Sequence, residues 1–343
     1  MDIDSVVEEI RQREEKWMEE AENLREELKE GEADTGPFIR EIEEAGIEDI
    51  DVAAVDGGLA RKEFHGADIY LRRAVAAVFG YTGGALDSSE YLPGKNPSPE
   101  TEYVTGNMDR KEADRLASLL RLEAEISVAE EAAGSADLLL LDGSLVPQPG
   151  DRPAVDSDLF ERYEELVARY RELYSGAEER GVELAGVVED ARSSRMCEAL
   201  EDRGYESERL ENGRDSALLQ HLLDPGQRTA SVPYTESSTP VLDDLGVDQS
   251  LHVFYLRTVE KDRPVRVEFL SQEEPEKEAD RIAGKILALC GSGSSYGIPP
   301  VLIEADQRAS LSTEEVELLT KRVEAKLAHL TGGEGLRRDR RPF

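Results

Sequence analysis

Two aspartates stand at the ends of two short apolar runs that resemble each other. One run is Val52–Val55, which precedes Asp56, and the other is Leu138–Leu141, which precedes Asp142; a glycine follows each aspartate. Apolar runs of this length that stop at Asp-Gly predict buried strands ending in a tight turn. Each strand would present one carboxylate at its carboxyl end, where open α/β sheets build their sites. The glycine leaves space for a ligand beside it.

If the two strands are neighbours, their carboxylates converge, and like charges that close need a cation between them. This predicts a magnesium or manganese site for phosphoryl-transfer chemistry, because carboxylates are hard oxygen ligands. The alternative is that Asp-Gly is simple turn chemistry, with the side chain bonded to nearby backbone. One such stretch would favour the turn, whereas two, each after a buried run, favour the metal site.

A third carboxylate is expected from the helix between these strands. Glu123 lies on a predicted helix over 108–133, so Asp56, Glu123 and Asp142 fall on strand, helix and strand. This is the layout of a ribonuclease-H-like core, in which two metal ions about 4 Å apart are bridged by carboxylates and hydrolyse a phosphodiester. The choice of glutamate stays open, because the same helix also carries Glu112, Glu125, Glu130 and Glu131.

The elements that must position these residues follow from apolar spacing. Apolar residues at spacings of three and four predict a long helix over 1–31, which either packs on its own domain or contacts a partner. Further strands are expected at 66–80, antiparallel to 51–56, and at 182–190, with a hairpin formed by 251–257 and 264–270. Helices are expected at 157–180 and 275–290, a capping box of Ser312 and Glu315 opens the last helix, and 82–107 and 224–241 are expected to be loops.

These elements define an α/β protein: a ribonuclease-H-like mixed central sheet flanked by helices, with a long N-terminal helix. We expect an N-terminal helical segment over 1–48, a nuclease domain with inserted helices and loops over 49–330, and a flexible basic tail over 331–343. The tail has four arginines in residues 336–343. It is either a frayed end or a contact for DNA phosphates or an acidic partner.

The composition is strongly acidic. The chain of 343 residues has 76 acidic and 41 basic residues, a net charge of −35, and only ten lysines. Its periodic apolar segments argue against disorder, and adaptation to a salt-rich cytoplasm explains the balance better. Because the Debye length in molar salt is only about 3 Å, this charge does not exclude a nucleic-acid partner. A cytoplasmic location is expected, since the sequence has no signal peptide or apolar stretch of membrane-spanning length. The two cysteines, Cys197 and Cys290, lack zinc-site spacing.

The order of the motifs resembles the NurA nucleases of archaeal DNA end processing. The matching pieces cover roughly residues 50–310: Val55–Gly58, Arg121–Glu123, Leu141–Leu145, Val187–Ser193, Phe254–Arg257 with Val267–Phe269, and Gly297–Leu302 with Ala305-Asp306. Each piece is short, and the specificity lies in their common order.

The resemblance implies a metal-dependent, manganese-using nuclease that acts on DNA ends and single strands, as a homodimer with a hexameric helicase partner of the HerA type. Its single-strand endonuclease and 5′–3′ exonuclease activities would serve double-strand break resection. Carried over to this chain, Asp56, Glu123, Asp142 and Asp306 are the implied catalytic metal ligands, for Mn²⁺ or Mg²⁺. Three arginines are assigned to DNA contact, Arg192, Arg195 and Arg257. No membrane association is implied.

Three positions depart from the family pattern. Ile298 stands where the family has tyrosine, Asp306 where it has histidine, and Glu189 where lysine is common. The departures leave open a catalytically weakened adaptor of a DNA translocase. An actin-like or sugar-kinase-like ATPase is the other alternative, for which Gly291–Ser295 is a weak candidate for a nucleotide-binding loop.

Overall fold

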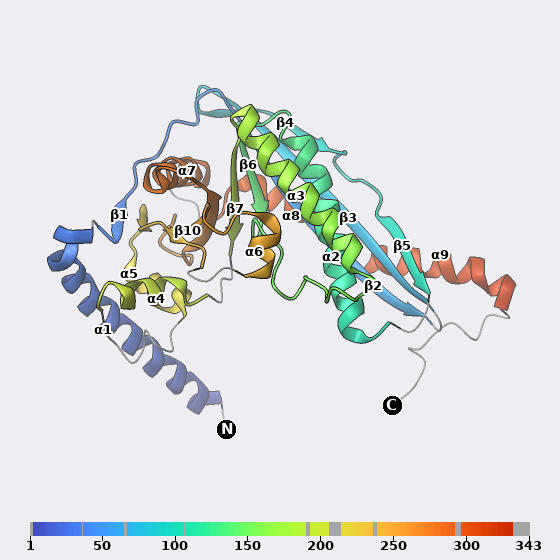
Figure 1. Cartoon of the computed structure of the whole chain (residues 1–343), viewed down its shortest axis with the longest axis horizontal. Coiled ribbons are helices and arrows are strands. Elements are labelled where there is room, and N and C mark those ends of the chain that lie inside the picture. The colour runs from blue at the N-terminus through green and yellow to red at the C-terminus, as the bar shows by residue number, and fades with distance from the viewer. Residues whose placement is uncertain are drawn as a thin grey trace. The chain divides into compact units, whose positions relative to one another are not determined.

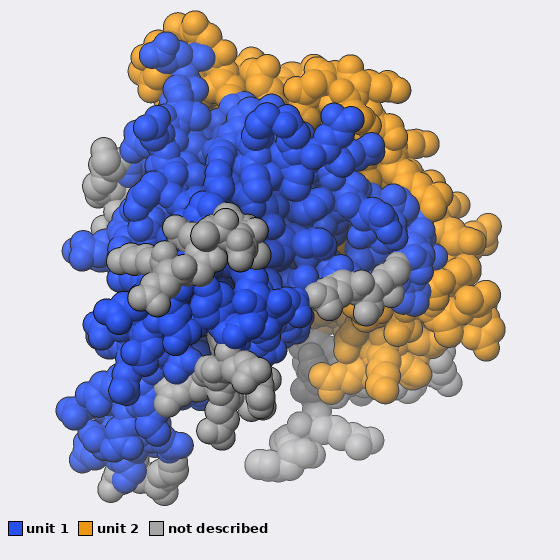
Figure 2. Space-filling model, turned by 60° about the vertical axis from the view of Figure 1, so that its left-hand side comes forward, with its two compact units in different colours: residues 1–48, 143–145, 185–300 blue, residues 49–142, 146–184, 301–343 orange. Residues whose placement is uncertain are grey.

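The computed structural model describes residues 3–35, 37–64, 67–105, 108–189, 193–205, 214–235, 239–291 and 296–331. Arg192, the Gly-Ser residues 292–295 and the basic tail from residue 332 onward lie outside the described residues. The chain divides into two compact units, coloured separately in Figure 2. Unit 1 contains residues 1–48, 143–145 and 185–300, and unit 2 contains residues 49–142, 146–184 and 301–343. Within the described ranges, no helix is long and apolar enough to cross a membrane.

Unit 2 is built on a mixed sheet with the strand order β6-β2-β3-β4. Strands β2 (Ile50–Phe64) and β3 (Ala67–Thr82) form a long antiparallel pair, and β6 (Leu138–Asp142) pairs in parallel with β2. Strands β4 (Ala85–Leu92) and β5 (Glu100–Thr105) both pair antiparallel with β3. The apolar runs of β2 and β6 are buried, which explains why both strands could be recognised from sequence.

Helices cover this sheet. The helices α2 (Arg110–Ala132) and α3 (Phe160–Arg180) run side by side along the β2–β3 pair (Figure 1). Helix α2 begins after Asp109, whose side chain accepts a hydrogen bond from the Glu112 amide at 2.9 Å. Two further helices, α8 (Pro300–Ala309) and α9 (Thr313–Thr331), follow at the end of the chain. The expected cap of the last helix is confirmed, because the Ser312 hydroxyl accepts from the Glu315 amide at 3.1 Å.

Unit 1 holds an antiparallel sheet in the order β1-β8-β10-β11-β7, with β9 on β10. The predicted hairpin is confirmed as β10 and β11. The strands are β1 (Ile39–Glu41), β7 (Glu183–Val188), β8 (Gln227–Thr229), β9 (Val232–Pro233), β10 (Leu251–Arg257) and β11 (Val265–Leu270). The helices are α1 (Ile3–Thr35), α4 (Arg195–Asp202), α5 (Asp215–Leu222), α6 (Pro240–Leu245) and α7 (Pro275–Cys290).

The long N-terminal helix packs on its own unit through its middle section. Trp17, Ala21 and Leu24 of α1 are buried in one apolar cluster with Leu218 and Leu222 of α5. Apolar side chains closer to its N-terminus are exposed instead: Ile3, Val6, Val7 and Ile10. Both alternatives considered for this helix therefore keep a physical basis, in different parts of it.

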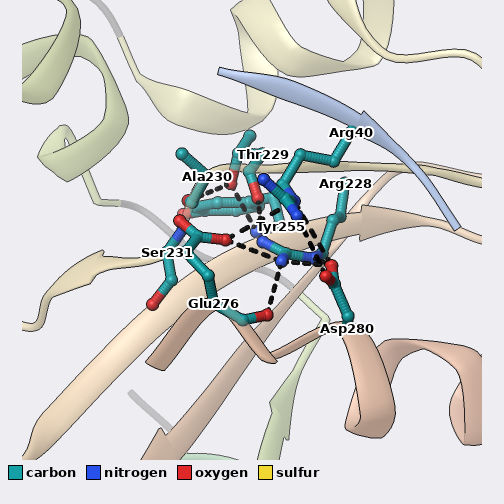
Figure 3. Close-up of polar contacts among 8 residues, drawn as sticks. All are labelled: Arg40, Arg228, Thr229, Ala230, Ser231, Tyr255, Glu276 and Asp280. Atoms are coloured by element: carbon teal, nitrogen blue, oxygen red, sulfur yellow. Dashed lines mark hydrogen bonds and ion pairs between the residues drawn. The ribbon is translucent and has the colours of Figure 1, made fainter. Parts of the chain in front are cut away.

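An ion cluster fastens the β1–β8 side of unit 1 to α7 (Figure 3). Arg228 of β8 is fully buried, and its guanidinium donates to Asp280 and, at 2.7 Å, to Glu276. Arg40 of β1 donates to the same Asp280 carboxylate at 3.0 Å. The Arg228 guanidinium also lies 5.4 Å from the ring centroid of Phe254. A buried guanidinium without these carboxylates would carry a large desolvation penalty.

The expected α/β class with a mixed sheet, flanking helices and a long N-terminal helix is confirmed, but three local predictions were wrong. One was the loop over 224–241, which contains the short strands β8 and β9. Another concerned 51–56: β2 does not stop at Asp-Gly but continues to Phe64, with Gly57 paired to Ala74 and Gly58 to Arg73. The third was the loop over 82–107, which contains β4 and β5. Most of their side chains are exposed, so no buried apolar alternation marks these strands in the sequence.

Candidate metal centre

Three carboxylates of unit 2 converge at one point. Asp56, Asp142 and Asp306 each offer an oxygen, and these oxygens all lie within 4.8 Å of one another. Asp56 and Asp142 are half-buried and Asp306 is exposed, so the cluster opens to solvent on one side. The structure thus brings together three of the four predicted ligands.

The strand register places the first two. The parallel pairing of β2 with β6 aligns Val55 with Leu141, so Asp56 and Asp142 are the next residue on each strand. The side chains of paired residues on neighbouring parallel strands project from the same face of the sheet. The carboxylates of Asp56 and Asp142 therefore lie on one face, at the point where the pairing of β2 with β6 ends. The expectation of neighbouring Asp-Gly strands is therefore confirmed.

Helix α8 supplies the third carboxylate. Ala305 and Ala309 are fully buried, which turns Asp306 outward on the same helix. Gly58 permits the close approach of the helix end, because a Cβ at this position would collide with the Ala309 carbonyl oxygen. The second glycine of the Asp-Gly-Gly motif therefore serves helix packing and not a turn.

The carboxylates influence one another electrostatically. Burial raises the pKa of Asp56 above its ordinary value, while its hydrogen bond with the Gly57 backbone lowers it and the nearby Asp306 carboxylate raises it. A charged group of opposite sign favours the ionised form, and Arg121 acts in that direction on Asp56. The cluster is thus a place where negative charge is concentrated and a cation would be stabilising.

Glu125 of α2 is a fourth carboxylate beside the cluster. A Cβ on Gly57 would lie only 2.6 Å from Glu125 Cγ and Oε1, so the glutamate packs directly on the backbone next to Asp56. Glu125 is buried, and burial raises its pKa to about 8; Arg121 opposes this shift, while Asp56 and Asp142 add to it. The first glycine of the motif is therefore the space that this side chain fills.

Glu123, the glutamate assigned from sequence, is not brought to the cluster. Its carboxylate accepts hydrogen bonds from Arg72 at 2.9 Å and from Arg162, and Arg162 also bonds Glu102. Two residues separated by one other on a helix point about 200° apart, so Glu123 and Glu125 face different neighbours. Glu123 borders a polar groove of about 960 Å³, whose lining residues include none of the three clustered aspartates.

Arg121 was not singled out as functional from the sequence. It stands one helical turn before Glu125, and its Nη1 donates to Glu125 Oε1 at 2.5 Å. Its side chain keeps 38% of its surface exposed, whereas Glu125 keeps 11%. The i,i+4 spacing is the only sequence signal for this pair, and such pairs are common on helix surfaces.

The arginines assigned to DNA contact are used differently. Arg195 donates to the Pro233 carbonyl at 3.1 Å and pairs with Glu198. Arg257 donates to the carbonyls of Gln220, Leu223 and Glu260 at 2.7–2.8 Å. Both guanidiniums therefore hold unit 1 together, and a DNA contact stays a prediction that this geometry does not favour. Arg192 lies outside the described residues.

The donor set fits a hard divalent cation. It consists of carboxylate oxygens alone, spaced closely enough to share one ion or bridge two, and magnesium and manganese prefer such ligands. Asp56, Asp142 and Asp306 would hold the ion, and Glu125 packs on Gly57, the residue next to Asp56. Without a cation, three carboxylates at this spacing repel one another.

Fold and site together define a mixed α/β protein with an open, all-carboxylate metal centre. The NurA domain family model matches residues 50–311, and the chain belongs to this family. The matched region contains all four carboxylates around the cluster. No curated protein matches the sequence.

Solved structures of NurA proteins share the fold. The NurA nuclease from Sulfolobus solfataricus aligns with a TM-score of 0.64 at 17% identity, over 96% of this chain and 95% of that one. A NurA bound to dAMP and manganese aligns with a TM-score of 0.54 at 12% identity, over 96% and 98%. A NurA with manganese aligns with a TM-score of 0.53 at 12% identity, over 86% of this chain and 92% of that one.

Proposed function

We propose that this chain is a metal-dependent deoxyribonuclease that hydrolyses phosphodiester bonds with manganese or magnesium. The observation that carries the proposal is the convergence of Asp56, Asp142 and Asp306, whose oxygens lie within 4.8 Å of one another. Family membership supports it. So do the relatives, one of which is a nuclease and another of which binds manganese and dAMP.

The clustered residues would hold the metal ion and leave one side of it open to the substrate. When bound, divalent cations activate water and stabilise the leaving oxygen of a phosphodiester. Asp56 and Asp142 are fixed by strand pairing and therefore provide the rigid side of the site. Asp306 lies on the exposed side, where a substrate phosphate would enter. Glu125, packed against Gly57, would hold the position that sequence reasoning gave to Glu123.

The finer assignments belong to the same proposal. We expect action on single strands and duplex ends in double-strand break resection and homologous recombination, with a HerA-type hexameric helicase as partner. A homodimer would cover Ile3, Val7 and Ile10, which are exposed on α1. The nuclease domain would extend over 49–330, after the helical segment 1–48. The acidic composition fits a halophilic archaeon and its cytoplasm.

The proposal is tested by incubating the purified chain with end-labelled single- and double-stranded DNA in high-potassium buffer, with Mn²⁺, Mg²⁺ or EDTA. We expect cleavage with either metal and none with EDTA. Asp56→Asn and Asp142→Asn should each lose about a hundredfold or more in rate while keeping their thermal transition, because a cation's charge stabilisation amounts to several kcal/mol. Asp87→Asn, an exposed carboxylate on β4, is the control.

Two results would argue for the alternatives. A parent protein that binds DNA with metal but never cuts it would be the adaptor. Metal-dependent ATP hydrolysis without DNA cleavage would favour the ATPase reading, whose candidate Gly-Ser loop falls largely outside the described residues. Cleavage that persists in Asp56→Asn would place the reaction elsewhere.

A further inference from the structure

Arg121 is a cationic residue beside the metal centre, paired with Glu125. Its Nη1 donates to Glu125 Oε1 at 2.5 Å, and Glu125 packs on Gly57 beside Asp56. The bond to a buried partner restrains the guanidinium, while 38% of the arginine side chain remains exposed. The positively charged guanidinium of Arg121 is therefore held next to the catalytic carboxylates and remains open to solvent.

The Arg121 guanidinium has N–H donors that are not used within the described part of the chain. In the described part of the chain, its hydrogen bonding is limited to the one bond through Nη1. An arginine carries five N–H donors in a planar fork that matches phosphate oxygens. Nε and Nη2 can therefore bond a phosphate while Nη1 stays on Glu125. This differs from Arg162, whose donors are shared between Glu102 and Glu123.

A positive charge from the protein would add to that of the bound metal ion. Asp56, Asp142, Asp306 and Glu125 are acidic, and a nucleic-acid backbone that approaches them adds further negative charge. Arg121 lies close enough to Asp56 for the two charges to act on each other. A restrained guanidinium at this place offsets repulsion of the substrate at no cost in reorganisation.

We propose that Arg121 is a substrate-binding residue that contacts a backbone phosphate of the DNA next to the bond that is cut. This inference rests on the proposed nuclease function. Glu125 is then also a positioning residue, because its carboxylate holds the guanidinium that meets the phosphate. The contact is to the backbone, so it carries no base specificity.

The test compares Arg121→Gln and Arg121→Lys with the parent, using Arg110→Gln as the matched control. Arg110 lies on the same helix with 93% of its side chain exposed and pairs only loosely with Asp114, at 3.8 Å. Fluorescence anisotropy measures the Kd of a labelled single strand over a salt series, with Ca²⁺ in place of Mn²⁺ to suppress cleavage. A Mn²⁺ titration without DNA and steady-state kinetics with Mn²⁺ complete the set.

We expect Arg121→Gln to raise the DNA Kd and KM about tenfold, which corresponds to about one phosphate contact, and to lower the salt slope by about 0.7. Mn²⁺ binding without DNA should be equal or tighter, because a neighbouring positive charge has been removed. Arg121→Lys should recover part of the loss, since it keeps the charge but not the fork. Arg110→Gln should match the parent.

A lower affinity for DNA beside an unchanged or higher affinity for Mn²⁺ separates substrate binding from a structural role. If Arg121→Gln weakens both together, or if it binds DNA with the parent's Kd and salt slope, the inference is wrong. A parent that neither binds nor cuts DNA with metal present would instead overturn the proposed function itself.

Discussion

Asp56 and Asp142 are the residues that directly follow Val55 and Leu141, the last aligned pair of two parallel neighbouring strands. Each side chain is therefore placed by backbone hydrogen bonds and not by a loop. Sites built on strands hold their geometry more precisely than sites on loops. Asp306 joins from α8 and stays exposed, so the rigid and the accessible parts of the cluster come from different elements.

The two candidate glutamates of α2 can be separated by paired variants. Glu125→Gln should weaken Mn²⁺ binding and slow cleavage, because Glu125 packs beside Asp56. Glu123→Gln should leave Mn²⁺ binding unchanged but destabilise the fold by about 1–3 kcal/mol, since its partners Arg72 and Arg162 are left partly unpaired. Calorimetric Mn²⁺ titration and thermal unfolding measure the two effects. If Glu123→Gln weakened Mn²⁺ binding and Glu125→Gln only destabilised the fold, Glu123 would be the ligand.

Glu125 also predicts how the stability of the metal-free protein depends on pH. Burial raises its pKa from an ordinary 4.5 to about 8, so the folded state keeps a proton that the unfolded state has released. Between these two pH values the folded state binds more protons than the unfolded state, so the free energy of unfolding falls as pH rises. The stability that the protonated Glu125 contributes is complete below pH 4.5 and is lost as pH rises to about 8. In EDTA, the difference in Tm between Glu125→Gln and the parent should therefore grow in favour of the variant from pH 5 to pH 8. A constant difference would show that Glu125 is ionised throughout.

The ion cluster around the buried Arg228 in unit 1 makes a prediction independent of the metal centre. Arg228→Met should destabilise the fold, because Glu276 and Asp280 lose their buried partner. The two carboxylates keep 39% and 38% of their side-chain surface exposed and can be hydrated, so the loss should be about 1–3 kcal/mol, the cost of the unmade hydrogen bonds. Molar KCl should not hide the loss, since buried pairs are screened much less than surface pairs. Thermal unfolding in low and high salt measures this.

The control for that experiment is Lys277→Gln. Lys277 of α7 pairs with Glu274, the residue just before this helix, and both side chains are well exposed. Surface pairs contribute about 0–1 kcal/mol, so this variant should unfold near the parent's Tm. Equal Tm values for the parent and Arg228→Met would mean that the cluster contributes nothing net.

The sequence predicted elements whose burial leaves a periodic apolar pattern. Strand β6, the hairpin of β10 and β11, and helix α7 were recognised in this way. In each case the burial of one face or of a whole strand fixes which residues are apolar. The hypothesis of a metal site required the strands of Asp56 and Asp142 to be neighbours, and the structure meets that condition. The N-cap at Ser312 could be predicted for a different reason, because a local hydrogen bond requires specific residue types at fixed spacing.

The remaining features depend on contacts that a local pattern does not contain. Glycines at 57 and 58 were taken as turn residues, but they are small because Glu125 and the end of α8 approach the strand there. The sequence could not decide between Glu123 and Glu125, because α2 packs against both the strands and α3, so buried positions occur around the helix. Helical periodicity then cannot say which acidic residue faces β2.

Asp306 predicts the metal preference of the site. The NurA resemblance places a histidine at this position, whereas this chain offers an exposed carboxylate within 4.8 Å of Asp56 and Asp142. An all-oxygen site suits magnesium, and an imidazole shifts preference towards manganese and softer ions. Asp306→His should therefore raise the ratio of manganese- to magnesium-supported cleavage and of the corresponding binding constants, while Asp306→Asn should weaken both metals. Initial rates and calorimetric titrations with each metal measure these ratios. Gln307, an exposed neighbour on the same helix, gives the control variant Gln307→His. If the manganese-to-magnesium ratio of cleavage rates is unchanged in Asp306→His, residue 306 does not contact the ion.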